Sequence, residues 1–150
     1  LLMIIRPIKY KDIPVMPSLL TQLGYPCTLE QVQSRFEHLF TLRDYCTYVA
    51  EKDDKVVGMV GFSKQFAYEL DGPCVRVLAL VVDEKNRNQG IAEKLIGAVE
   101  NWSKVENCVA ISLNSGNTPE RLAAHAFYKK LGYVGKSTGF SKTIERNETP

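Results

Sequence analysis

The sequence predicts an α/β fold in which helices pack against a mixed sheet. Short runs rich in Val, Ile and Phe alternate with stretches whose apolar residues recur every third or fourth position, and these are the spacings of strands and helices. The predicted order is one strand, two helices, three strands, then helix, strand, helix and two short strands. With 150 residues, 45% of them hydrophobic, the chain can build one core, so we expect a single domain over residues 1–150.

The N-terminal part is expected to form one strand and two helices. Residues 3–6 are apolar and extended in pattern, and residues 12–23 place apolar side chains at helical spacing. Thr28 is a predicted N-cap, because Gln31 follows at the distance of a capping box. The second helix is then expected to run to about Phe40.

The middle of the chain is expected to form three strands and one long helix. Residues 46–51 and 56–66 flank Asp53-Asp54-Lys55, the pattern of a hairpin turn. Residues 75–82 are almost continuously apolar and β-branched, which is typical of a strand covered on both faces. Residues 91–105 carry the apolar stripe of an amphipathic helix.

The C-terminal part is expected to alternate between strand and helix. Residues 108–113 form a predicted strand, and residues 122–131 form a predicted helix. Two short strands are expected at residues 133–134 and 140–144. The last residues, 146–150, are expected to fray.

Composition argues against several functional classes. The 19 basic and 17 acidic residues leave a net charge of +2, so electrostatics favour neither a nucleic-acid nor a membrane partner. The four cysteines form no C-x-x-C pair and the two histidines are scattered, so we expect no metal site and reduced thiols. The apolar start, residues 1–5, is too short for a signal peptide or a membrane span, which favours a cytoplasmic location.

One loop carries the pattern of an anion site. It lies between the strand at residues 75–82 and the helix at residues 91–105. A helix N-terminus has backbone N–H groups without helical partners and a partial positive charge, so it can bind phosphate. Gly90 and Ala92 leave room for that approach, and Asn88 tolerates left-handed backbone. The alternative is an ordinary strand-to-helix turn with solvated charges.

Two segments resemble the GNAT N-acetyltransferase superfamily. "LALVVDEKNRNQGIAEKLI" is similar to its acyl-coenzyme A signature, and "RLAAHAFYKKLGYV" is similar to its second signature, a tyrosine-bearing helix before Leu-Gly-Tyr. The form of this second signature, R-x-x-A-H-x-F-Y-x-x-x-G-Y, resembles that of a subgroup that includes small-molecule and aminoalkylphosphonate acetyltransferases. The resemblance implies a mixed, mostly antiparallel central sheet with a splayed strand pair, flanked by helices.

The resemblance also implies that acetyl-coenzyme A (acetyl-CoA) is the co-substrate. In this family the pantetheine arm pairs with the fourth strand of the sheet like an added strand, and the pyrophosphate binds the signature loop. Carried onto this sequence, the cofactor-binding residues are expected to be Leu80, Val81, Val82, Arg87, Asn88, Gln89, Gly90, Ile91, Ala92, Asn114 and Arg121.

Tyr128 is the residue that the resemblance assigns to catalysis. A tyrosine of ordinary pKa, about 10, is protonated at neutral pH and can donate a proton to the departing thiolate. The alternative is a tyrosine that only packs. His125, three residues earlier, is either a base, a partner of Tyr128 or a structural histidine.

The general base is left open. Many relatives carry a glutamate on the fourth strand, but this chain has Val77-Leu78-Ala79-Leu80 there. An alkylamine must lose its proton before attack. The base is either a water chain, Glu69 or Asp71.

The expected function is direct transfer of an acetyl group to a primary amine of a small molecule or peptide. Aminoglycosides, polyamines, aminoalkylphosphonates and peptide amines are all open as acceptors. Two alternatives are a non-catalytic acyl-CoA sensor and an unrelated nucleotide-binding module. Because many relatives dimerise, a homodimer is a further expectation.

Overall fold

The computed structural model describes residues 2–116 and 118–146. Contacts between residues divide the chain into two compact units, of which one ends at Leu113 and the other begins at Asn114. The first unit contains the sheet and three α-helices, and the second contains one α-helix followed by extended chain. Each unit is therefore described by itself.

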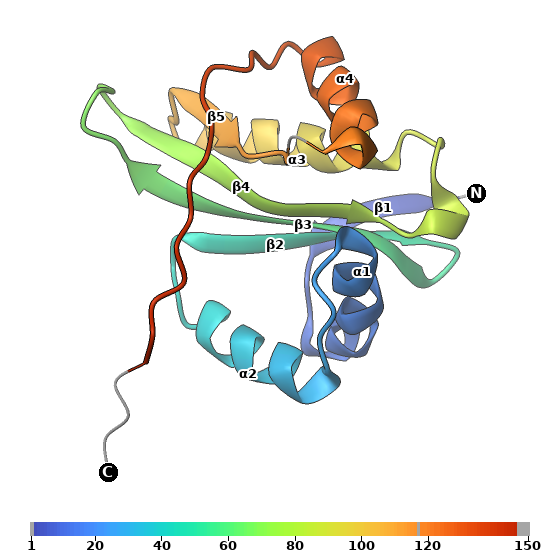
Figure 1. Cartoon of the computed structure of the whole chain (residues 1–150). Coiled ribbons are helices and arrows are strands. Elements are labelled where there is room, and N and C mark those ends of the chain that lie inside the picture. The colour runs from blue at the N-terminus through green and yellow to red at the C-terminus, as the bar shows by residue number, and fades with distance from the viewer. Residues whose placement is uncertain (1, 117, 147–150) are drawn as a thin grey trace. The chain divides into compact units, whose positions relative to one another are not determined.

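The sheet has five strands in the order β1-β2-β3-β4-β5. The first three neighbouring pairs are antiparallel and only β4 and β5 are parallel, which confirms a mixed, mostly antiparallel sheet (Figure 1). The parallel pair needs a crossover, and the helix between β4 and β5 supplies it. The strands are β1 Met3–Pro7, β2 Tyr45–Lys52, β3 Lys55–Phe66, β4 Pro73–Val82 and β5 Ala110–Leu113.

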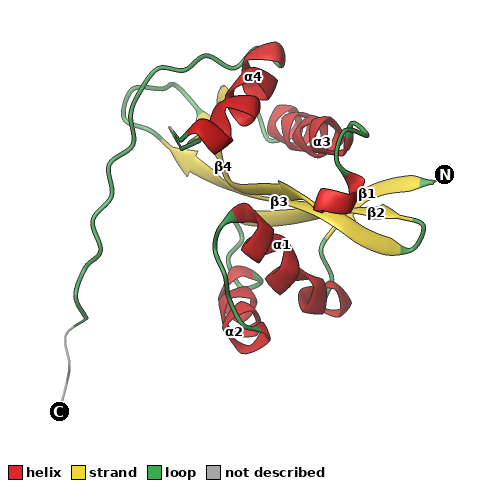
Figure 2. Cartoon of the chain, turned by 45° about the vertical axis from the view of Figure 1, so that its right-hand side comes forward, coloured by secondary structure: helices red, strands yellow, loops and turns green. Residues whose placement is uncertain are grey.

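Helices cover both faces of this sheet. The helices α1 (Met16–Leu23) and α2 (Leu29–Leu39) lie on one face, and α3 (Ile91–Val105) lies on the other (Figure 2). A 3-10 helix, Tyr10–Val15, precedes α1. The capping box predicted at the start of α2 is confirmed, since the Gln31 N–H donates to the Thr28 hydroxyl at 3.2 Å.

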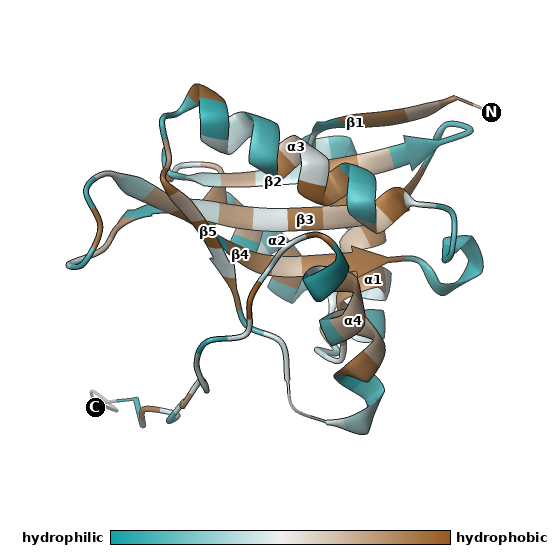
Figure 3. Ribbon diagram, turned by 90° about the horizontal axis from the view of Figure 1, so that it is seen from above, coloured by the Kyte–Doolittle hydropathy of each residue, from teal (hydrophilic) through white to brown (hydrophobic). Residues whose placement is uncertain are grey.

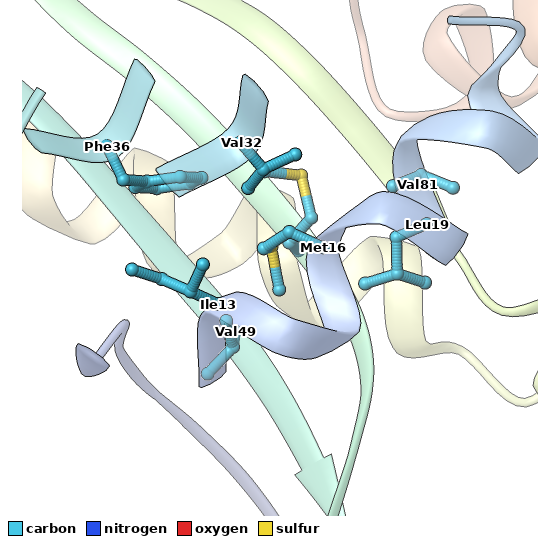
Figure 4. Packing of buried hydrophobic residues seen from close by; sticks show 8 residues of the cluster. Ile13, Met16, Leu19, Val32, Phe36, Val49 and Val81 are labelled. Atoms are coloured by element: carbon cyan, nitrogen blue, oxygen red, sulfur yellow. The ribbon is translucent and has the colours of Figure 1, made fainter. Parts of the chain in front are cut away.

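Each face has its own apolar layer. On the side of α1 and α2, buried side chains from both helices meet residues of β2, β3 and β4 (Figure 4). On the other side α3 lies across the sheet (Figure 3), and its Trp102 ring stands edge-on to Phe62 with centroids 5.2 Å apart. The first layer comprises Ile13, Met16, Leu19, Val32, Phe36, Val49, Met59 and Val81.

Gly58 on β3 lets the first turn of α3 come close to the sheet. A Cβ atom at Gly58 would lie 3.1 Å from the Val81 carbonyl oxygen, 3.3 Å from Leu95 and 3.4 Å from Ile91. The first two separations are tighter than ordinary van der Waals contact, so a side chain would require β4 or the helix to shift. The position of the α3 N-terminus therefore depends on a glycine in a neighbouring strand.

The two predicted C-terminal strands are wrong. Residues 133–134 and 140–144 are coil, and Val134, Phe140 and Ile144 are exposed, Phe140 to 95% and Ile144 to 76%. Strand preference depends on a neighbouring strand and on burial, and Gly135 and Gly139 weaken it further. Residues 147–150 of the end expected to fray lie outside the described residues.

Candidate cofactor-binding and catalytic site

A β-bulge divides β4 into two halves. Ala79 pairs with Gly61 and Val77 pairs with Phe62, so Leu78 has no counterpart on β3. Such an extra residue bends a strand and increases its twist. The Leu78 side chain is 49% exposed, which is unusual for a leucine in a central strand. The bulge therefore changes the course of β4 in its middle.

The pairing between β4 and β5 ends at the same place. Cys74 to Val77 pair with Ala110 to Leu113, and no further pair follows among the residues that the structure describes. In the first unit, β4 continues for five more residues, Leu78 to Val82, with β3 as its only strand neighbour. This half of β4 has an open edge on its β5 side.

The backbone groups of alternate residues point to that open edge. The Asp83 N–H donates to the Val57 carbonyl on β3 at 2.8 Å. Because backbone directions alternate along a strand, the N–H and C=O groups of Val81 also point toward β3. Leu80 and Val82 consequently direct their N–H and C=O groups to the opposite edge. The Val82 carbonyl accepts a 3.3 Å bond from Arg87 Nε, which agrees with this direction. Val81 instead buries its side chain in the core.

The loop after β4 adopts the left-handed geometry that its sequence allows. Asn88 has φ 62° and Gly90 has φ 74°, and α3 begins at the next residue, Ile91. A Cβ atom on Gly90 would meet no described atom within 4 Å. The space that a Gly90 side chain would enter is therefore open.

The N–H groups at this end of α3 are available to a ligand. The first bond of the helix joins the Lys94 N–H to the Gly90 carbonyl at 3.1 Å, and no side chain caps the helix. Among the described residues, the backbone N–H groups from Asn88 to Glu93 have no hydrogen-bond acceptor. N–H groups without acceptors and the positive end of the helix dipole are the features by which helix N-termini bind anions.

Side chains from distant elements hold this loop in place. Gln22 of α1 donates to the Asp83 carboxylate at 3.0 Å and accepts from the Glu84 N–H at 2.8 Å. Lys52 at the end of β2 donates to Gln89 Oε1 at 2.6 Å. Lys52 is a cation beside the loop that sequence reasoning missed, because it lies 37 residues from Gln89 and belongs to no motif.

Tyr128 lies on α4 (Leu122–Lys130), in the second unit. Its half-buried ring is edge-on to Phe127 and Tyr133, with centroids 5.3 Å and 6.1 Å away. Burial raises the pKa of the Tyr128 phenol, and the positive charge of Arg121 lowers it by less. The phenol therefore stays protonated through the neutral range and can donate a proton.

Other predicted residues of this unit have structural contacts. His125 Nε2 lies 2.8 Å from the Gly116 carbonyl, which only accepts, so Nε2 carries the proton in this contact. This contact favours a structural role for His125. Asn114 directly follows β5, is exposed, and has its amide 3.4 Å from the position of a Cβ on Gly139.

Glu69 and Asp71 lie in the exposed loop between β3 and β4, so the structure does not single out either as the base. Within the described ranges, no group of three or more His, Cys, Asp or Glu side chains could hold a metal ion. No helix in those ranges is long and apolar enough to cross a membrane.

Comparison with curated proteins finds N-acetyltransferases. Human N-acetyltransferase 8 is 36% identical over 104 residues, which are 66% of this chain and 42% of that protein. Human N-acetylaspartate synthetase is 38% identical over 88 residues, which are 59% of this chain and 27% of that protein. The chain thus spans less than half the length of these relatives.

Solved structures agree in fold. A GNAT family acetyltransferase from Staphylococcus aureus is 29% identical, has a TM-score of 0.81, and the match covers 96% of this chain and all of that one. The aminoglycoside N-acetyltransferase AAC(6')-Iy, solved with the bisubstrate analogue CoA-S-monomethyl-acetylneamine, is 20% identical with a TM-score of 0.81, over 96% of this chain and 99% of that one. The model of the acetyltransferase (GNAT) family matches residues 15–133, and the chain belongs to this family.

Proposed function

We propose that this protein is an acetyl-CoA-dependent N-acetyltransferase that acts on a primary amine in a ternary complex. The observation that carries the proposal is the combination of an uncapped α3 N-terminus with the open half of β4. One binds an anion and the other offers backbone groups to an extended chain. CoA has both parts, a pyrophosphate and a pantetheine arm with amides, and a protein of the same fold binds a CoA analogue.

The binding roles follow from the backbone. N–H groups from Asn88 to Ala92 hold the pyrophosphate, and Arg87 and Lys52 add positive charge. Leu80 and Val82 bond the pantetheine amides as a neighbouring strand would. Arg87 must then release the Val82 carbonyl, and its 3.3 Å bond is long enough for that exchange to cost little. Asn114 and Arg121 are further candidates for contact with CoA.

The chemistry needs an acid and a donor for the oxyanion. The amine nitrogen attacks the thioester carbonyl, the carbon–sulfur bond breaks, and acetyl-amine and CoA are formed. A backbone N–H within Leu80 to Val82 of β4 that the pantetheine amides leave free stabilises the oxyanion of the tetrahedral intermediate. Tyr128 gives its proton to the departing sulfur. Help of this kind is worth about 10²–10⁴ in rate.

A covalent acyl-enzyme is not needed. Burial raises the pKa of the Cys46 and Cys108 thiols, so both are poor nucleophiles at neutral pH. Direct transfer also requires that the amine lose its proton, and the acceptor of that proton is a water chain, Glu69 or Asp71. The location in the cytoplasm and a homodimer are kept as predictions.

The test measures thiol release from acetyl-CoA with a panel of amines. The panel contains aminoglycosides, polyamines, aminoalkylphosphonates, peptides and amino acids. Amino acids are included because one relative is named N-acetylaspartate synthetase, and N-acetylaspartate is an acetylated amino acid. We expect Tyr128→Phe to lower kcat about 100-fold or more while the Kd for CoA changes little. Tyr133→Phe, which changes a neighbouring ring, is the control. Unchanged kcat in Tyr128→Phe would remove it from the acid role.

The same panel separates the rival functions. A sensor would bind acetyl-CoA and release no thiol with any amine. An unrelated nucleotide-binding module would be stabilised more by ATP or NAD than by CoA in a thermal-shift ranking.

A further inference from the structure

Arg76 is a charged residue in the middle of the sheet. It lies on β4, is half-buried, and pairs with the buried Ser63 of β3. Phe62 contacts Trp102 of α3, so the next residue, Ser63, faces the other way, and Arg76 faces with it. Arg76 therefore points to the face of the sheet that carries α1 and α2.

This arginine has no partner among the described residues. No hydrogen bond or ion pair joins its guanidinium to any of them. Arg6, by contrast, donates two hydrogen bonds of 2.7 and 2.9 Å to the Asp12 carboxylate and a third, of 3.3 Å, to Glu51. A half-buried guanidinium without such a partner is suited to an anionic ligand, which it binds through two parallel bonds.

Its position places that anion beside the reaction. Arg76 lies two residues before the bulged Leu78, where β4 loses its β5 neighbour, and two residues of strand span about 7 Å. An arginine side chain covers that distance. Both α1 and α3 contact β4, from opposite faces, and Arg76 lies on the α1 and α2 side of the strand whose open edge begins two residues later.

We infer that Arg76 binds a carboxylate of the acceptor, so that the acceptor is an amino acid with its carboxylate next to the reacting amine. This inference rests on the proposed acetyl transfer and adds the substrate class. Arg76 selects the acceptor, and Tyr128 and the backbone of β4 perform the transfer.

The experiment compares L-amino acids with their α-amides and their 1-aminoalkylphosphonate analogues as acceptors. Thiol release is measured for the wild type, Arg76→Gln and Arg76→Lys. Arg43→Gln, which removes the same charge from an exposed loop, is the matched control. We expect the wild type to prefer an amino acid over its amide at least tenfold in kcat/KM. Arg76→Gln should lose roughly 10- to 100-fold on the acid, mainly in KM, and little on the amide.

Arg76→Lys keeps the charge and should recover part of the preference. A higher rate with the phosphonate than with the carboxylate would assign the anion to a phosphonate and overturn the amino-acid class. Equal losses on acid and amide, or no loss, would overturn the role of Arg76. An unchanged Kd for CoA shows that Arg76→Gln is folded.

A binding experiment decides the matter without turnover. N-acetyl amino acids and their amides are titrated in the presence of CoA by calorimetry. Tighter binding of the acid that Arg76→Gln abolishes supports the inference, and equal binding of acid and amide contradicts it. The proposed function fails separately, if the wild type does not bind CoA or releases no thiol with any amine.

Discussion

The two halves of β4 have similar side chains and different roles. Residues Cys74 to Val77 are paired with β3 on one edge and β5 on the other, whereas Ala79 to Val82 are paired with β3 alone and Leu78 is bulged. Both halves are mostly apolar and partly β-branched. The difference therefore comes from pairing, which changes at the bulged Leu78, and not from composition.

This difference shows how an ordinary strand gains a binding edge. An unpaired edge inside a sheet normally invites association with another strand. Here a loop, residues 83–90, joins the open half to the uncapped N-terminus of α3, so the backbone groups of Leu80 and Val82 lie close in sequence to those from Asn88 on. We expect changes in the open half to affect CoA binding and changes elsewhere to affect stability.

Gly90→Glu should have the largest effect. It places a carboxylate where the diphosphate is proposed to bind, and it forces a bulkier residue to adopt φ 74°. We expect CoA binding to be abolished in calorimetry. Gly90→Asn is the control, because asparagine tolerates left-handed backbone without adding charge. If Gly90→Glu binds CoA like the wild type, the anion site is not at this loop.

Asp12→Asn should destabilise the fold and leave the open half of β4 intact. Asp12 is 3% exposed, and Arg6 and the Lys9 N–H bond its carboxylate at 2.7–2.9 Å. Breaking one side of a buried pair costs about 3–5 kcal/mol. Urea unfolding should show this loss, while the Kd for CoA of the folded fraction stays within about twofold of the wild type.

The pH dependence of the free energy of unfolding tests whether the charge of Asp12 stabilises the fold. Bonds from Arg6 hold the pKa of Asp12 below its ordinary value of about 3.9. A lowered pKa gives stability that is present above about pH 4 and is lost as the pH falls through the folded-state value. The wild type should therefore lose stability more steeply than Asp12→Asn below pH 4. Parallel curves would show that Asp12 does not act through its charge.

Deletion of Leu78 tests the bulge directly. Without it, Ala79 and Val77 would be consecutive opposite Gly61 and Phe62, so the ladder with β3 becomes regular and each side chain keeps its face. We expect a folded protein with a straighter β4 and CoA affinity lowered roughly 10- to 100-fold, the loss of about two backbone bonds. Circular dichroism confirms folding. If the folded deletion variant binds CoA with wild-type affinity, the bulge at Leu78 is not needed for binding.

Lys52→Gln should have the smallest effect. Lys52 holds Gln89 at 2.6 Å and adds one positive charge near the loop. Its loss should weaken CoA binding about two- to fivefold, and less at high salt, because exposed charges are screened. Lys55→Gln, in the same hairpin, is the control, because the Lys55 side chain makes no hydrogen bond or ion pair with the described residues of the loop. If both changes weaken CoA binding equally, Lys52 contributes only through its positive charge and not through its bond to Gln89.

Local signals made much of this structure predictable. Residues 91–105 were identified by their apolar stripe, and α3 has these bounds. Thr28 and Gln31 form the expected capping box, and Asp53 and Asp54 form the turn with φ 50° and 62°. Each feature depends on residues within a few positions of one another.

What the sequence did not predict depends on contacts between distant residues. The bulge at Leu78 follows from the register with β3, and Gln22 meets Asp83 across 61 positions. The strand expected at residues 140–144 has a suitable pattern but no strand partner in the described structure. Strand pairing and loop support are decided by tertiary structure, and local sequence does not specify them.

Amide hydrogen exchange with and without CoA tests the central claim most directly. The account predicts that the N–H groups of Leu80 and Val82 and those from Asn88 to Ala92 exchange more slowly when CoA is present, while Val75 and Val77 are unchanged. Protection confined to the doubly paired half of β4, or absent from the start of α3, would contradict it.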